Sequence, residues 1–196
     1  MSKGDYFDTA SAICFIPPQS AHESINSVRQ RYDRAYPKWP PHINWSFPSA
    51  SLAKFDEVKG KLTTALAEVK PFTIDLTTID RFSKKGNSTF HLKPADKSGL
   101  EEVFDVIHAA VPELTKNHDS FKPHLTLGQC RNKYYDNTIS KVEDMLDLSS
   151  YTFTVDRVYM VRFEIVGQDD RGRNILKHKV VHEVMLGGGD AEVADE

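Results

Sequence analysis

The stretch that decides the fold is Phe121-Lys-Pro-His-Leu-Thr-Leu-Gly-Gln129. Its polar and apolar residues alternate, which is typical of a short β-strand with one buried face. His124 and Thr126 then share one face, about 7 Å apart along the strand, while Leu125 and Leu127 enter the core. An imidazole beside a hydroxyl combines a proton-transfer group with a hydrogen-bond donor, and this pair suits an anionic substrate.

The same pattern occurs a second time. Pro41-His42-Ile43-Asn44-Trp45 repeats the order proline, histidine, apolar, polar, apolar, 82 residues before His124. In the strand predicted over residues 43–47, His42, Asn44 and Ser46 share one face. The other face is apolar and is expected to pack in the core: Ile43, Trp45 and Phe47.

The remaining elements follow the same order in both halves of the chain. Strands are predicted over residues 10–16, 43–47, 72–79, 88–93, 121–129, 151–165 and 175–186, and helices over 20–36, 52–69, 98–111 and 136–148. The sequences Ser20-Ala-His-Glu23 and Ser98-Gly-Leu-Glu101 predict a capping box at the start of two helices. We therefore expect a duplicated α+β fold, in which the two histidine strands are symmetry mates across a central groove.

Composition limits the class of protein. The 196 residues, 39% of them hydrophobic, are enough for a sizeable core. A net charge of −3 argues against wrapping of long nucleic acid, although a local pocket for one phosphate is compatible with it. The two cysteines predict reducing surroundings without a disulfide framework or zinc knuckle. No apolar run approaches the roughly 20 residues of a membrane span, and the N-terminal residues lack a signal-peptide core, so we expect a soluble protein of the cytoplasm or nucleus.

Two imidazoles facing one cleft, with no acidic cluster or metal-ligand spacing beside either motif, suit concerted acid–base catalysis. A neutral histidine takes a proton from the attacking water, and a protonated one delivers a proton to the leaving oxygen. Each contribution is worth roughly 10²–10⁴-fold in rate. Phosphodiester cleavage needs both at once, and Asn44 and Thr126 would hold the non-bridging phosphate oxygens.

The paired Pro-His motifs and the order of elements over residues 10–186 resemble the two-histidine (2H) phosphoesterase superfamily, which includes 2′-5′ RNA ligase-like proteins and 2′,3′-cyclic nucleotide phosphodiesterases. The family pattern is His-x-Thr/Ser-x, present twice. His124 and Thr126 match the second motif in full. His42 matches the first, but Asn44 stands where Thr or Ser is expected, and Ser46 offers a hydroxyl two residues further on.

This resemblance implies a bilobal fold of two antiparallel sheets around a concave, metal-independent site that needs no cofactor. It implies a single domain over residues 1–186, and we expect residues 187–196 to form a flexible acidic tail. The implied reaction is hydrolysis of 2′,3′-cyclic phosphates, on RNA ends or small nucleotides, to 2′-phosphates by His42 and His124. The reverse reaction, 2′-5′ ligation of RNA ends, is the alternative.

Two interpretations of other classes remain open at this point. The first is a module that binds RNA ends or nucleotides with little turnover, with Asn44 as the sign of lost activity. The second is a metal-dependent hydrolase that uses His178 and His182, but in a strand this pair would be about 13 Å apart, too far for one metal ion. Trp39 is a candidate platform for stacking a base, or a wedge that fixes its loop against the core.

The other polar candidates have structural or solvent-facing interpretations. His91 is expected to have a structural or solvated role, and His108 and His118 are expected to be surface residues. The basic turn around Arg81 and Lys84-Lys85 could attract an RNA phosphate or remain solvated. Two further residues lie on a segment that could border the groove: Tyr159 and Arg162.

Overall fold

The computed structural model describes residues 7–8, 10–117 and 121–189. Two larger sheets dominate it, with strand orders β11-β10-β2-β3 and β6-β7-β8, and two strand pairs, β1-β4 and β5-β9, complete it. Every strand pair in the described part of the chain is antiparallel. The predicted α+β fold with antiparallel sheets is therefore confirmed.

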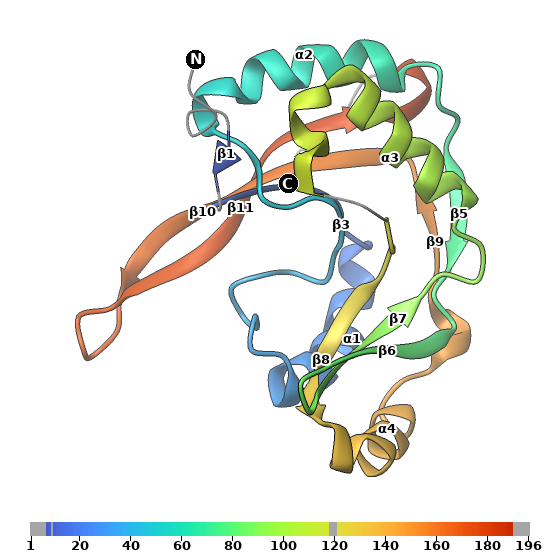
Figure 1. The fold of residues 1–196 in the computed structure, drawn as a ribbon, viewed down its shortest axis with the longest axis vertical. Helices are drawn as coiled ribbons and strands as arrows, with labels where there is room; N and C mark the ends of the chain where they lie inside the picture. The colour runs from blue at the N-terminus through green and yellow to red at the C-terminus, as the bar shows by residue number, and fades with distance from the viewer. Residues whose placement is uncertain (1–6, 9, 118–120, 190–196) are drawn as a thin grey trace.

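The strands are β1 (Phe7–Asp8), β2 (Ser11–Phe15), β3 (Ile43–Ser46), β4 (Ser49–Ala50), β5 (Phe72–Asp75), β6 (Thr78–Lys84), β7 (Asn87–Lys93), β8 (Leu125–Arg131), β9 (Thr152–Val155), β10 (Arg157–Gln168) and β11 (Asn174–Met185). The helices are α1 (His22–Tyr32), α2 (Phe55–Leu66), α3 (Ser98–Ala110) and α4 (Tyr135–Glu143). In Figure 1, α2 and α3 lie side by side above the four-stranded sheet, and the β10–β11 hairpin extends away from the body. None of the described helices is long and apolar enough to cross a membrane.

One buried core joins the two sheets. It contains Ile43 from β3 and Leu125 and Leu127 from β8, all fully buried, so both histidine strands are anchored by their alternate apolar residues as predicted. Trp45 is fully buried, and its indole Nε1 donates a hydrogen bond to the Leu100 carbonyl of α3 at 3.0 Å. The core role predicted for Trp45 is confirmed.

Helix α1 lies directly against β8 because the strand has a glycine where the two elements meet. A Cβ atom on Gly128 would lie 2.4 Å from the Cβ of Tyr32 and 2.7 Å from the ring of Phe90. A buried ion pair on α1, between Arg29 and Asp33 (2.9 Å), extends the contact, since Gln129 of β8 donates to the same Asp33 at 3.2 Å. These contacts fix the two halves of the chain to each other beneath the histidine strands.

Several predictions about element ends are wrong. The strands predicted over residues 72–79 and 151–165 are each divided in two, so that β5 pairs with β9 while β6 and β10 join different sheets. Neither predicted capping box forms: a 3₁₀ turn over Gln19–Ala21 precedes α1, and at α3 the Asp96 carboxylate accepts the Ser98 amide at 2.9 Å. Strand β3 ends at Ser46, and Phe47 is 40% exposed rather than in the core.

Some expectations fall wholly or partly outside the described residues. His118 lies there, as do residues 190–196 of the predicted tail, while Leu186–Gly188 form a 3₁₀ turn. The single-domain interpretation of residues 1–186 stays a prediction. His108 is buried rather than exposed, with its Nδ1 2.8 Å from the Phe104 carbonyl one helical turn earlier.

A candidate two-histidine site

His42 and His124 occupy matching positions in the two larger sheets. His42 immediately precedes β3, and His124 immediately precedes β8; each strand is the edge of its sheet. Each ring is held in the same way. Nδ1 of His42 lies 2.8 Å from the Pro40 carbonyl, and Nδ1 of His124 lies 2.7 Å from the Lys122 carbonyl.

These two hydrogen bonds determine which nitrogen is available for chemistry. A carbonyl oxygen only accepts, so Nδ1 must carry the proton in both rings. Nε2 is then the nitrogen with the free lone pair, and it lies on the side of each ring away from the backbone contact. Both imidazoles are therefore presented to a substrate in the same tautomer, ready to take or return a proton at Nε2.

The surroundings disfavour a positive charge on either ring. Burial lowers the pKa of His42 to about 4, and the charges of Arg29, His178 and His124 act in the same direction. Burial also lowers the pKa of His124. A charge on His124 also acts on the pKa of His42, and in both rings burial favours the neutral imidazole over the imidazolium.

The residues two positions further along each strand differ in what they offer. The side-chain Oδ1 of Asn44 is buried and has no hydrogen-bond partner among the described residues. Thr126 is half-buried and lies opposite His91 in the β7–β8 register. Ser46 is fully buried, and its hydroxyl donates to the Pro48 carbonyl at 3.3 Å, so its proton is already engaged. The Ser46 hydroxyl is therefore less available to a ligand than the Asn44 amide, whose N–H donors would face a phosphate oxygen after a 180° turn of the amide.

Trp39 lies in the centre of an aromatic cluster beside His42. The ring of His42 stacks on it with centroids 4.5 Å apart, and the ring of His178 lies 4.4 Å away. Phe47 and Phe163 contact it edge-on. The cluster favours the interpretation of Trp39 as a support for the His42 loop, and its role in stacking a base stays a prediction.

His91, for which the sequence predicts a structural or solvated role, is buried beside His124. It is 2% exposed, its ring stacks on Phe82 at 4.3 Å, and it meets the edge of the His124 ring at 5.1 Å. Burial lowers the pKa of His91 to about 4, and the neighbouring His124 acts in the same direction. Only the strand register, in which His91 is paired with Thr126, brings it to His124, so no local sequence pattern could have found it.

The remaining candidates are engaged by other partners. His178 and His182 are on β11 as predicted; His182 bonds Asp56 at 3.0 Å, whereas His178 packs on Trp39. Within residues 7–8, 10–117 and 121–189, no three His, Cys, Asp or Glu side chains gather as metal ligands. Arg81 packs over the Tyr135 ring at 4.0 Å, and Arg162 pairs with Glu164.

Comparison with known proteins identifies the class of protein to which this fold and site belong. The model of the 2′-5′ RNA ligase superfamily matches residues 17–165, and the chain belongs to this superfamily. A protein of Shouchella clausii (strain KSM-K16) named "Putative phosphoesterase" is 27% identical over 183 residues, which cover 91% of this chain and 98% of that protein.

Solved structures show the same fold. The crystal structure of TT0787 from Thermus thermophilus superposes with a TM-score of 0.57 at 15% identity, covering 92% of this chain and all of that one. The apo structure of E. coli LigT gives a TM-score of 0.56 at 13% identity, covering 91% and 97% of the two chains. The resemblance of the sequence to the 2H phosphoesterases is confirmed.

Proposed function

We propose that this protein is a metal-independent phosphodiesterase that hydrolyses 2′,3′-cyclic phosphates, on RNA ends or small nucleotides, to 2′-phosphates. The single observation that carries the proposal is the matched hydrogen bonding of His42 and His124. Each Nδ1–H donates to the carbonyl two residues earlier, which leaves Nε2 of each ring available for proton transfer. Membership of the superfamily supports the reaction class. Among the solved relatives, E. coli LigT has been crystallised with phosphate and with 3′-AMP.

In the proposed reaction, one neutral imidazole accepts a proton at Nε2 from the attacking water as the new P–O bond forms. The other, protonated at Nε2, donates that proton to the 3′ oxygen as its bond to phosphorus breaks. The product carries a 2′-phosphate and a free 3′-hydroxyl. The two rings have then exchanged protonation states, and solvent exchange restores them.

Burial disfavours the imidazolium form of both rings, so the bound substrate must stabilise the proton that one of them carries. The anionic phosphate supplies the reason, because a negative charge beside an imidazolium raises its pKa. The Asn44 amide and the Thr126 hydroxyl would donate to the non-bridging oxygens as negative charge develops on them.

The test is turnover of adenosine 2′,3′-cyclic phosphate by His42→Ala and His124→Ala. Each variant should lose about 10²–10⁴-fold in kcat, the contribution of one proton-transfer partner. His182→Ala is the control, since this strand histidine bonds Asp56 and lies outside the pair. Excess EDTA should leave the turnover of the wild-type protein intact.

Near-normal turnover by both single variants would remove His42 and His124 from the proposal. Affinity for the cyclic nucleotide without any product would favour the alternative of a binding module. Formation of a 2′-5′ bond from separate RNA ends would favour the ligase alternative. Loss of activity on chelation, restored by added zinc or manganese, would favour a metal-dependent reaction.

A further inference from the structure

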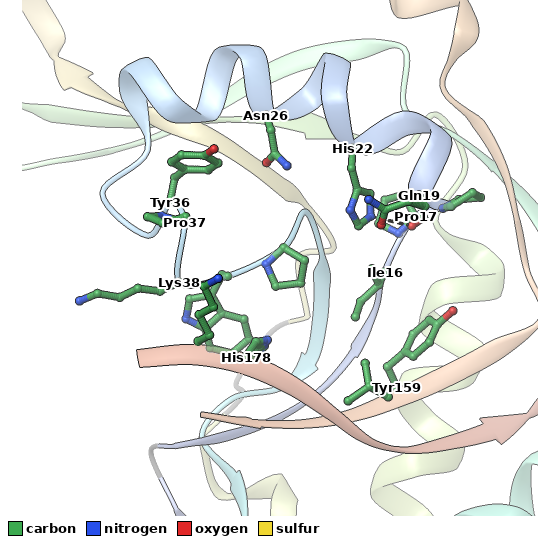
Figure 2. Close-up of a pocket in the computed structure, with 15 residues that line it drawn as sticks. Ile16, Pro17, Gln19, His22, Asn26, Tyr36, Pro37, Lys38, Tyr159 and His178 are labelled. Atoms are coloured by element: carbon green, nitrogen blue, oxygen red, sulfur yellow. Dashed lines mark hydrogen bonds between the residues drawn. The ribbon is translucent and has the colours of Figure 1, made fainter. Parts of the chain in front are cut away.

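A cavity of about 600 Å³ adjoins the two-histidine site and shares Trp39 with it. Its volume is within the roughly 300–1,000 Å³ that is usual for small-molecule sites. The walls come from the start of α1, from the loop before His42 and from strands β10 and β11. Figure 2 shows His22 and Asn26 extending from α1 toward the cavity, with Tyr159 and His178 on the side of the strands. His42 and His124 are not among the described residues that line it, so it is a neighbouring space.

The lining is basic and rich in hydrogen-bond donors. Among its described residues there is no aspartate or glutamate. It includes two lysines, two histidines, two amides and two phenols: Lys38, Lys177, His22, His178, Gln19, Asn26, Tyr36 and Tyr159. Lys38 and Lys177 are exposed, and neither forms an ion pair within the described part of the chain. An anion in this cavity would therefore find two ammonium groups that no carboxylate of the lining engages.

One buried polar atom in the wall lacks a partner. Nε2 of His178 is buried without a hydrogen bond to any described residue, and burial lowers the pKa of this ring to about 4. The ring packs on Trp39, which in turn stacks on His42, so this unsatisfied nitrogen lies one aromatic ring away from the catalytic candidate. A buried polar group without a partner costs stability, and a ligand oxygen or hydroxyl would satisfy it.

From these observations we infer that the cavity is a subsite for a second anionic group of the substrate, namely a 5′-phosphate on the nucleoside that carries the cyclic phosphate. The inference deepens the proposed function and rests on it. Lys38 and Lys177 supply the charge. The apolar residues of the lining, which include Ile16, Pro40 and Val180, accept the nucleoside. Two substrates share this chemistry: a mononucleotide with a free 5′-phosphate, and an RNA end, where the 5′-phosphate is the link to the preceding nucleotide.

The experiment compares kcat/KM for three substrates. The first is adenosine 2′,3′-cyclic phosphate, and the second is the same cyclic phosphate with an added 5′-phosphate. The third is a dinucleotide of two adenosines whose 3′ end carries the 2′,3′-cyclic phosphate. The 5′-phosphate should raise kcat/KM about tenfold, the value of one charged hydrogen bond. In a Lys38→Ala/Lys177→Ala double variant this ratio should fall to one, while kcat/KM for the unphosphorylated nucleoside stays unchanged. Lys59→Ala, an exposed lysine of α2, is the matched control and should keep the ratio.

A ratio of one in the wild-type protein, or an undiminished ratio in the double variant, would overturn the inference while leaving the proposed function intact. A gain with the dinucleotide alone would support the subsite and identify RNA ends as its source. A gain with the mononucleotide alone would support the subsite for free nucleotides.

A protein that turns over none of the three substrates would contradict the proposed function, and direct binding then decides about the subsite. Titration calorimetry with adenosine 5′-monophosphate and with adenosine should show a preference for the phosphorylated ligand that the double variant loses. Equal affinity for the two ligands would overturn the inference.

Discussion

Asn44 is the residue at which this chain leaves the family pattern, and its buried Oδ1 has no partner among the described residues. Rotation of the amide by 180° exchanges oxygen and nitrogen, and it would place two N–H donors where Oδ1 now lies. A non-bridging phosphate oxygen at that position would satisfy the group. The departure from Thr or Ser therefore keeps a neutral donor beside His42 and does not by itself indicate lost catalysis.

Replacement of Asn44 tests this role. Asn44→Ala should lower kcat/KM on a cyclic nucleotide by about 10²–10³-fold, the cost of one donor to the transition state. Asn44→Thr should recover much of that loss, because it restores a hydroxyl donor. Ser46→Ala should be mild, since its hydroxyl donates to Pro48. A severe Ser46→Ala effect beside a mild Asn44→Ala effect would reverse the assignment.

The protonation of the two histidines predicts the shape of the pH profile. Burial lowers the pKa of both His42 and His124 in the free protein, that of His42 to about 4. The kcat/KM profile reports the free enzyme, so it should be bell-shaped with its maximum below about 6.5, the ordinary histidine value. The kcat profile should lie at higher pH, because bound phosphate stabilises the imidazolium. A kcat/KM maximum above pH 7 would contradict this electrostatic account.

At the scale of the elements, the contact between α1 and β8 depends on Gly128. An added methyl group would meet Tyr32 and Phe90 at distances that side chains do not tolerate. Gly128→Ala should therefore lower the free energy of unfolding by roughly 1–3 kcal/mol, the usual cost of overpacking. Denaturant titration measures this change.

Gly60 is the matched control, because it lies inside α2 with nothing within 4 Å of an added Cβ. There the same substitution should raise the free energy of unfolding by about 0.5–1 kcal/mol through helix propensity. Equal changes in the free energy of unfolding at the two positions would show that the close contact between α1 and β8 does not affect stability.

The elements also show what the sequence could predict. The two histidine strands follow from alternation within five to nine residues, a pattern that needs no knowledge of distant partners. The capping box predicted at Ser98 does not form because Asp96, two residues earlier, accepts the hydrogen bond from the Ser98 amide instead. Phe47 was assigned to the core by alternation alone, but Trp39 from the preceding loop gives it an edge contact at the surface.

Contacts between segments that are far apart in the chain could not be predicted from the sequence. The assembly of Trp39, His42 and His178 depends on how β11 pairs with β10, and His91 reaches His124 only through the β7–β8 register. The backbone hydrogen bonds that fix Nδ1 of both catalytic candidates depend on loop geometry, which residue spacing does not determine.

At the scale of the whole molecule, several histidines are neutral in the folded protein. Burial lowers the pKa of His42, His91 and His178 to about 4 each, against an ordinary value near 6.5. Between these values the unfolded chain binds protons that the folded protein does not. Stability is therefore fully present above pH 6.5 and falls as the pH decreases toward 4.

His91 is the best position at which to measure this linkage, because it is almost fully buried and lies next to the proposed catalytic pair without belonging to it. The charge of His124 and burial both oppose its protonation, while Asp80 favours it. Each such group changes the free energy of unfolding by at most about 1.4 kcal/mol per pH unit. His91→Gln should therefore reduce the pH dependence of stability by up to that amount between pH 4.5 and 6.5.

Above pH 7, where neither state gains a proton at this position, the wild-type and variant curves should run parallel. Urea titrations over this range measure both slopes, and identical slopes below pH 6.5 would mean that His91 takes up its proton as readily in the folded protein as in the unfolded chain.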